Sequence, residues 1–288
     1  MDLSAYERRI LNAIPADQRT EILARYAVAI ARQLRSAIRT RYTHDAVVKQ
    51  ILDTLEVVRF QAPSVLIREL KNNKRLVCIN LPDQPFIVDS VRMHLKRLGA
   101  QFVTGFNVIV GLKRNETGKV IAVDEANLQL ESILRFELEG EFTKSVSEME
   151  QSLIECLELG RVVVADFTDM TNAMEKSSER FEDASRIILE RRDEMLEASD
   201  FVDWLLQENF VFMGLQMGEQ RSGILRTGLD GLWPATILDW NPEMNGTPVV
   251  VRKGKVESPI HRVGLIDEIY LAVPTRDGQG VTPIRIVG

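Results

Sequence analysis

The sequence predicts an α+β chain with a helical N-terminal segment, a layered domain of strands and helices, and a second small α+β domain with a mostly antiparallel sheet. Three observations carry this prediction. Apolar residues recur at helical spacing over residues 4–58. β-type runs then alternate with amphipathic runs, and after residue 199 glycine, proline and β-branched residues dominate. The expected domains are therefore 1–62 (helical), 63–168 (layered), 169–198 (one or two linking helices) and 199–288 (second α+β domain).

The N-terminal segment is expected to be helical because its apolar residues repeat every three to four positions. They are Ile10, Leu11, Ile14, Ile22, Leu23, Tyr26, Ile30, Leu34 and Ile38. A further short helix is expected from His44 to Leu52.

A strand, a tight turn and a helix follow in the next region. The apolar run 75–81 is expected to be a strand that stops at Pro82, and a helix is expected over 84–98. Asp83 is suited to cap that helix, and Gly99 to end it in a left-handed conformation. Because the first turn of a helix has free N–H groups, this turn could hold a small anion or carboxylate.

Two longer strands are expected at 102–112 and 128–138. In the first, Phe102, Phe106, Val108, Val110 and Leu112 share one face, and Val103, Gly105, Asn107, Ile109 and Gly111 share the other. In the second, Leu128, Leu130, Leu134, Phe136 and Leu138 alternate with Gln129, Glu131, Arg135 and Glu137, which predicts a half-buried strand.

A helix over 141–157 completes the order strand, helix, strand, strand, helix. A fourth strand at 162–165 would give the βαββαβ order of a ferredoxin-like sandwich. The alternative is a continuing helix, because Val162, Val163, Phe167, Met170 and Met174 also fit helical spacing.

The second domain is expected to begin with a helix over 200–209 that leads into a strand. Several short strands should follow, at 223–225, 248–252, 258–262, 266–273 and 281–287.

Composition and motifs favour a binding or regulatory module over an enzyme. A net charge of −6 and a pI near 5.4 argue against nucleic-acid binding. We expect no membrane span, a cytoplasmic location because the start of the chain does not resemble a signal peptide, and buried thiols at Cys78 and Cys156. The sequence has no glycine-rich nucleotide loop and no nucleophile elbow, and its three histidines have no metal-ligand spacing. No catalytic, cofactor-binding or metal-binding residue is therefore expected.

The stretch Asn80–Val91, which contains Asp-Gln-Pro-Phe-Ile-Val-Asp-Ser-Val, resembles the ACT domain near the amino terminus of the large bacterial NAD-dependent glutamate dehydrogenases. ACT domains are ferredoxin-like modules that sense amino acids. Segments that resemble later parts of the same family follow in the same order: Trp204-Leu205 with Phe210, Phe212 and Gly214, then 249–251, 258–262 and Asp267. The chain departs from the pattern at Phe86, where ordinary ACT domains usually have glycine, and at Val263, where the family often has proline.

The resemblance implies a parent enzyme that deaminates glutamate to 2-oxoglutarate with NAD, through segments beyond Gly288. This chain would be its regulatory part, with an amino-acid effector, the rest of the enzyme and further copies of itself as partners. The candidate effector-binding residues are Asn80, Asp83, Gln84, Pro85, Phe86, Asp89, Gly105 and Asn107.

In this hypothesis the carboxylate of the effector lies at the N–H groups of 83–86. Its amino group then meets Asn80, Asp83 or the carbonyl groups near Gly105 and Asn107. Two alternatives stay open. Gly105 and Asn107 could serve only sheet packing or a subunit contact, and the whole module could be an assembly scaffold that binds no ligand.

Overall fold

The computed structural model describes residues 4–58, 64–124, 128–226 and 246–288. The chain divides into two compact units, Met1–Ile154 and Glu155–Gly288, called here the first and second unit. The division falls inside helix α7 (Val146–Ile187), whereas the sequence predicts boundaries at 62/63, 168/169 and 198/199. The first of these boundaries lies outside the described residues. None of the helices in the described ranges has an apolar stretch of membrane-spanning length.

The helices expected over residues 4–58 are present as five short helices. They are α1 (Ala5–Ala13), α2 (Glu21–Gln33), α3 (Ser36–Arg41), α4 (His44–Asp53) and α5 (Leu55–Val58). Ser4 and Glu7 form a capping box at α1, because each side chain accepts a hydrogen bond from the backbone N–H of the other. Thr20 and Thr43 cap α2 and α4 in the same position. Local sequence thus determines where these helices begin.

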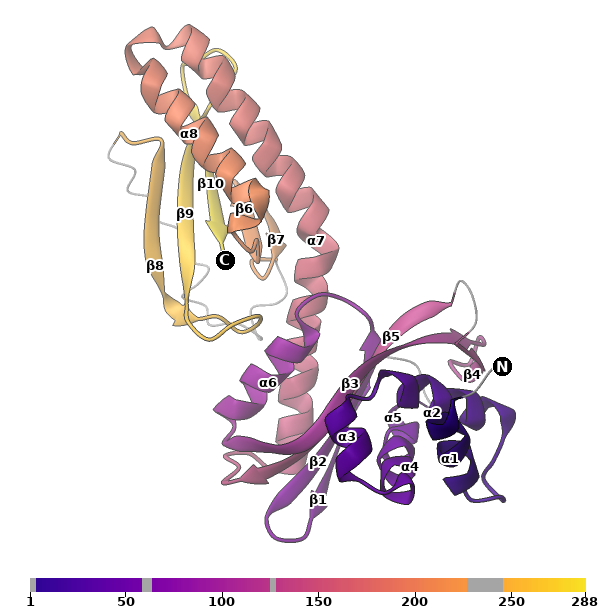
Figure 1. Ribbon diagram of the computed structural model, residues 1–288. Helices are drawn as coiled ribbons and strands as arrows, with labels where there is room; N and C mark the ends of the chain where they lie inside the picture. Colours follow the sequence, from indigo (N-terminus) through magenta and orange to yellow (C-terminus); the bar gives the residue numbers. More distant parts are fainter. Residues whose placement is uncertain (1–3, 59–63, 125–127, 227–245) are drawn as a thin grey trace. The chain divides into compact units, whose positions relative to one another are not determined.

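The first unit contains one antiparallel sheet of five strands (Figure 1). The strands are β1 (Ser64–Leu70), β2 (Lys74–Pro82), β3 (Ala100–Arg114), β4 (Val120–Val123) and β5 (Gln129–Gly140), in the spatial order β1-β2-β5-β3-β4. Helix α6 (Ile87–Arg97) connects β2 to β3. It ends before Gly99, whose φ of 85° confirms the predicted left-handed position.

The predicted fourth strand at 162–165 is wrong, and the alternative of a continuing helix is confirmed. These residues lie within α7, where Leu159, Val162, Val163 and Met170 are buried along one helical stripe. In a ferredoxin-like sheet the fourth strand pairs antiparallel with the first. Here β1, which precedes that first strand in the chain, takes the same place beside β2. The sequence does not predict β1, because apolar and polar residues do not alternate along it. Its last three residues, Arg68, Glu69 and Leu70, are all exposed.

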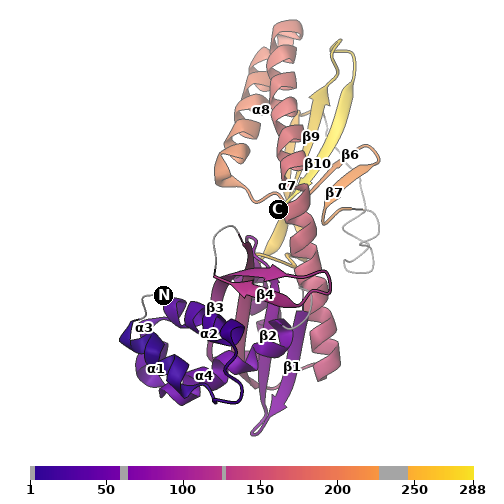
Figure 2. The same cartoon turned by 90° about the vertical axis from the view of Figure 1, so that its right-hand side faces the viewer.

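Helices cover both faces of this sheet (Figure 2). Helices α1–α5 pack on one face, where Tyr26, Ile30 and Ile51 meet Cys78 and Phe106 in one core. Helix α6 and the first turns of α7 cover the other face. Both cysteines are free and buried, as predicted, and burial raises the pKa of the Cys78 thiol to about 12.

The structure corrects two expectations about which residues share a face of the sheet. Glu131 and Arg135 on β5, expected to face solvent, are only 1% and 6% exposed because they point toward α1–α5. A β-bulge between Phe102 and Thr104 shifts the register of β3, so that Phe102 leaves the face of Phe106 and contacts Arg92 of α6 instead. From Phe106 to Leu112 the predicted alternation is confirmed.

The second unit is a helical hairpin on an antiparallel sheet. The chain turns at residues 188–191, and α8 (Arg192–Trp204) runs back beside α7 (Figure 1). The sheet has the order β7-β6-β10-β9-β8, with β6 (Gly214–Met217), β7 (Gln220–Gly223), β8 (Val249–Glu257), β9 (Leu265–Pro274) and β10 (Val281–Val287). Met174, Phe181 and Val202 of the helices pack on Leu271 and Ile286 of the sheet. Residues 171–198 are thus part of a core.

Two of the short strands expected here are absent. Residues 258–262 form a turn in which His261 has a φ of 71°, and Ile224 and Leu225 follow the end of β7 as a turn. The buried side chains of Ile260, Ile224 and Leu225 explain the error, because apolar residues that anchor a turn in the core look like a strand in the sequence.

Gly99 provides a test of the junction between α6 and β3. We expect Gly99→Ala to lower the free energy of unfolding of the first unit by at least about 2 kcal/mol. An added Cβ would lie 2.1 Å from the carbonyl oxygen of Glu141, and the φ of 85° is unfavourable for alanine. Urea unfolding followed by circular dichroism measures the loss.

Gly218→Ala is the matched control, because Gly218 also has a positive φ of 60° but nothing lies within 4 Å of an added Cβ. We expect a cost of about 1 kcal/mol there. Equal costs at the two positions would show that the contact with Glu141 does not restrict residue 99.

Candidate functional site

The turn between β2 and α6 is held by β5 and not by a helix cap. The N–H of Asp83 donates to the carbonyl of Leu130 (2.9 Å), and its carboxylate accepts from the Ser132 hydroxyl (2.6 Å). The prediction that Asp83 caps α6 is therefore wrong. The capping position belongs to Phe86, which has a φ of 68° and makes no side-chain cap hydrogen bond. A positive φ favours glycine, which explains why a glycine suits this place in ordinary ACT domains.

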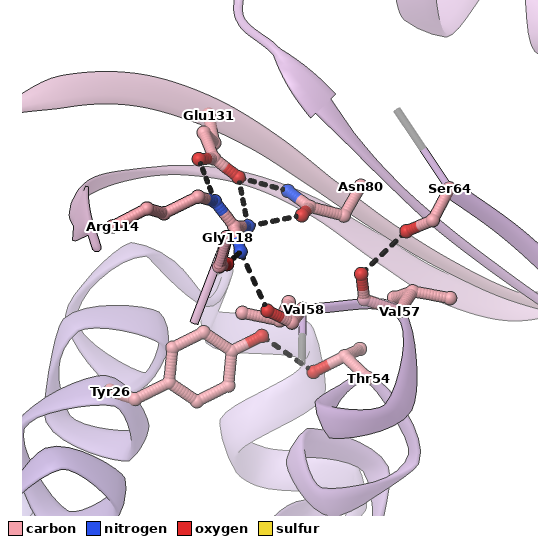
Figure 3. Close-up of polar contacts among 9 residues, drawn as sticks. All are labelled: Tyr26, Thr54, Val57, Val58, Ser64, Asn80, Arg114, Gly118 and Glu131. Carbon is pink, nitrogen blue, oxygen red and sulfur yellow. Dashed lines mark hydrogen bonds and ion pairs between the residues drawn. The ribbon is translucent and has the colours of Figure 1, made fainter. Parts of the chain in front are cut away.

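Asn80 points to the opposite side of β2 from α6, into a buried polar network (Figure 3). Its side-chain N–H₂ donates to the Glu131 carboxylate (2.8 Å), and its carbonyl oxygen accepts from Arg114 (2.9 Å). The side chain is 0% exposed. Asn80 is therefore committed to structural contacts in this conformation.

Arg114 is the centre of this network, and each of its five N–H groups has an acceptor. Two donate to the two oxygens of Glu131 at 2.7 Å, in a bidentate ion pair, and one donates to Asn80. The last two donate to the carbonyl groups of Val58 (3.0 Å) and Gly118 (2.7 Å). One side chain thus connects three strands, the end of α5 and the β3–β4 turn.

Two further contacts hold the helical layer, one to the sheet and one within the layer. Arg135 of β5 donates to the carboxylate of Asp53, the last residue of α4, at 2.9 and 3.1 Å. Tyr26 of α2 shares a hydrogen bond with Thr54 at 2.8 Å, and burial raises the pKa of its hydroxyl. We find here a face closed by charge pairing, without a free donor on Arg114 for a ligand.

Gly105 and Asn107 lie on β3, away from the turn. An added Cβ at Gly105 would lie 2.3 Å from the carbonyl oxygen of Arg135 and 2.6 Å from the Phe136 ring, so glycine is required for the close approach of β5. The side chain of Asn107 is exposed.

The strand register separates the candidate residues into two groups. Pro82, at the turn, pairs with Glu131, which pairs with Val110 of β3. Gly105 is five residues from Val110, about 17 Å along the strand, and β5 lies between β2 and β3. Asp83, Gln84, Pro85, Phe86 and Asp89 thus form one group at the turn, and Gly105 and Asn107 form another. Their role in effector binding stays a prediction.

The second group lies on an open edge of the sheet. Strand β3 pairs with β5 along nearly its whole length, but on the other edge it pairs with β4 only at 112–114. The Gln33 side chain donates to the carbonyl of Ile109 (2.5 Å) and accepts from its N–H (3.0 Å) on that edge. Because alternate residues direct their backbone groups the same way, Gly105 and Asn107 also present N–H and C=O groups there. No strand of the described ranges pairs with them.

These features define a ferredoxin-like α+β module whose sheet is covered by helices on both faces and has one open strand edge at β3. In the described part of the chain, no group of three or more His, Cys, Asp or Glu side chains could hold a metal ion.

Comparison with known proteins gives the family. Residues 6–153, about half of the chain, match the family model described as "Glutamate dehydrogenase, ACT1 domain". The chain belongs to this family, which confirms the resemblance identified at Asn80–Val91.

Two curated relatives carry the same name. The chain is 31% identical over 154 residues to the NAD-specific glutamate dehydrogenase of Halomonas elongata. This alignment covers 51% of this chain and 10% of that protein. It is 26% identical over 228 residues to the NAD-specific glutamate dehydrogenase of Pseudomonas aeruginosa. This second alignment covers 69% of this chain and 14% of that protein. The matched part of the chain therefore spans only 10% and 14% of the length of these relatives.

Sequence reasoning missed Arg114, Glu131 and Gln33. The charged residues of β5 could have indicated a buried ion pair, because a charged residue at the centre of a strand lies either on an exposed face or in a buried face with a partner. Without the positions of α1–α5, the exposed alternative was the simpler interpretation.

Glu131 allows a test of the buried pair. We expect Glu131→Ala to destabilise the first unit by about 3–5 kcal/mol, because it leaves the Arg114 charge buried without its counter-ion. The double variant Arg114→Met/Glu131→Leu should cost less than the single one, since it removes both charges. Urea unfolding of the two variants and the wild-type chain measures the difference.

Glu56→Ala is the control, because Glu56 and Arg68 form an ion pair with side chains 50% and 45% exposed. Such a pair contributes below about 1 kcal/mol. If Glu131→Ala costs no more than Glu56→Ala, the network does not hold the helices on the sheet.

Proposed function

We propose that this chain is the regulatory amino-terminal part of a large NAD-dependent glutamate dehydrogenase, and that it acts in the assembly of that enzyme. The family match and the two relatives support the parent enzyme. Oxidative deamination of glutamate to 2-oxoglutarate with NAD would belong to segments outside this chain. A cytoplasmic location is part of the same proposal.

The open edge of β3 is the observation that carries the assembly role. An unpaired strand edge presents N–H and C=O groups that another strand can bind, and proteins usually cover, shorten or charge such edges. On β3 the unpaired edge comprises Gly105 and Asn107, and the side chain of Asn107 is exposed. Ile109, whose backbone groups are bound by Gln33, adds an apolar side chain that is 42% exposed. A second copy of the chain could add its own β3 here, which would join two five-stranded sheets.

Amino-acid sensing at the β2–α6 turn is the second candidate. The exposed positions of Asp83 and Asp89 support it, since an amino group could meet either carboxylate. It is the weaker candidate, because Asn80 is committed to Arg114 and Glu131 and because Gly105 is about 17 Å along β3 from the level of the turn.

Oligomeric state tests the assembly role. We expect the 288-residue chain to form dimers in sedimentation analysis without any ligand. Asn107→Pro should shift the chain to monomers, because proline removes the outward N–H of an edge strand without disturbing the pairing with β5. Ile109→Lys should do the same by placing a charge on the edge, and it keeps the test valid if the proline variant does not fold.

Glu69→Pro is the matched control on the other edge strand, β1, and should leave the dimer intact. On β1 the N–H of Ile67 already donates a hydrogen bond to the Glu150 side chain, so this edge is partly covered. A monomeric wild-type chain, or a dimer that survives both β3 substitutions, would contradict the assembly role. Turnover of glutamate with NAD by this chain alone would contradict the regulatory role.

A further inference from the structure

The second unit contains a cleft whose basic side chains have no function in the account above. Its volume is about 770 Å³, within the usual range for small-molecule sites. One wall is α7, and the other walls are β6, β7 and the turn between β9 and β10. The cleft lies wholly within the second unit.

Four cationic side chains line this cleft, against one carboxylate, Asp169. Lys176 and Arg180 project from α7 at positions i and i+4, which places them on one side of the helix. Arg221 comes from β7, and Arg276 comes from the β9–β10 turn. The chain as a whole has a net charge of −6, so a cleft with four cations and one carboxylate differs from the average of its residues.

Most of these cations lack a carboxylate partner. Arg180 lies 3.7 Å from Asp183, a long and exposed contact. Within the described ranges, Lys176, Arg221 and Arg276 form no ion pair. By contrast, Arg161, Arg191 and Arg226 in the same unit each pair with a carboxylate. The cleft therefore brings together three cations without a counter-ion, whereas Arg192, Lys255 and Arg262, which also form no ion pair in the described ranges, lie outside its lining.

Hydrogen bonds brace the backbone of the β9–β10 turn, which carries the exposed residue Arg276. The hydroxyl of Thr275 donates to Asp277 (2.6 Å) and accepts from the N–H of Gly280 (3.0 Å), and the N–H of Thr275 donates to the carbonyl of Gly280 (2.9 Å). A side chain on such a braced turn loses less freedom when it binds a ligand.

We propose that this cleft binds a small aliphatic molecule that carries at least two carboxylate or phosphate groups. Arginine forks match the oxygens of both groups, and cations on opposite walls require a ligand with separated negative charges. Buried Leu215, Val273 and Ile284 supply an apolar floor for the carbon chain. The described lining residues include no aromatic side chain, so no ring is available to stack on a nucleobase.

This site is independent of the β3 edge, and its test does not use the oligomeric state. Calorimetry on the 288-residue chain at low ionic strength would use glutarate as the dicarboxylate, fructose 1,6-bisphosphate as the phosphorylated ligand, acetate as a monoanion and AMP as a nucleotide. We expect saturable binding of glutarate, of the bisphosphate, or of both, tighter than that of acetate and AMP. Which of the two binds distinguishes the carboxylate source from the phosphate source.

Arg221→Gln/Arg276→Gln should weaken that binding about tenfold or more for each arginine removed. Both side chains are unpaired, so unfolding without ligand should not change. Arg192→Gln/Lys255→Gln removes the same charge from exposed positions outside the cleft and should leave the affinity within about twofold. The proposal is overturned if neither glutarate nor the bisphosphate binds, if AMP or acetate binds as tightly, or if both double variants weaken binding equally.

Discussion

The buried ion pair between Arg114 and Glu131 is the contact on which the first unit depends. Its two charges lie where a ferredoxin-like sheet packs against five short helices, and Asn80, Val58 and Gly118 complete the coordination of the guanidinium group. Burying two charges contributes little net stability, but it makes any other register of helices and strands costly, because that register would leave one charge unpaired. We infer that the pair selects this arrangement over its alternatives.

The same pair explains why Asn80, in the most recognisable stretch of the sequence, is not available to a ligand in this conformation. Asn80 begins the Asn80–Val91 segment, yet its side chain turns away from the segment to complete the network. Phe86 then occupies a left-handed position that suits glycine better, and Asp83 bonds to Ser132. The edge of β3 is also accessible in the first unit, and there the Gln33 side chain of α2 binds the backbone of Ile109 as a neighbouring strand would.

The parts of the fold that depend on local sequence could be predicted, and those that depend on tertiary pairing could not. Periodicity identified the N-terminal helices, and the succession of strand, proline turn and amphipathic helix identified the β2–α6 connection and the left-handed Gly99, but not the residue that caps α6. The three valines at 162–164 fit both a strand and a helix in the sequence, and the structure decides for the helix, since α7 continues from Val146 to Ile187. The bulge after Phe102 and the burial of Glu131 could not be predicted either, since both are imposed by neighbours far away in the sequence. For the candidate site, the sequence indicates which residues could bind an effector, but it does not indicate which of them lie close together. The strand register determines that.

Hydrogen–deuterium exchange of single backbone amides at increasing protein concentration tests the central claim, that the open edge of β3 is an assembly surface, most directly. The account predicts that the amides of Gly105 and Asn107 become protected as dimers form. The amide of Ile109 serves as the internal reference, because the Gln33 side chain accepts its hydrogen bond in the monomer as well. If Gly105 and Asn107 exchange equally fast at all concentrations while the chain dimerises, the copies meet elsewhere and the claim is wrong.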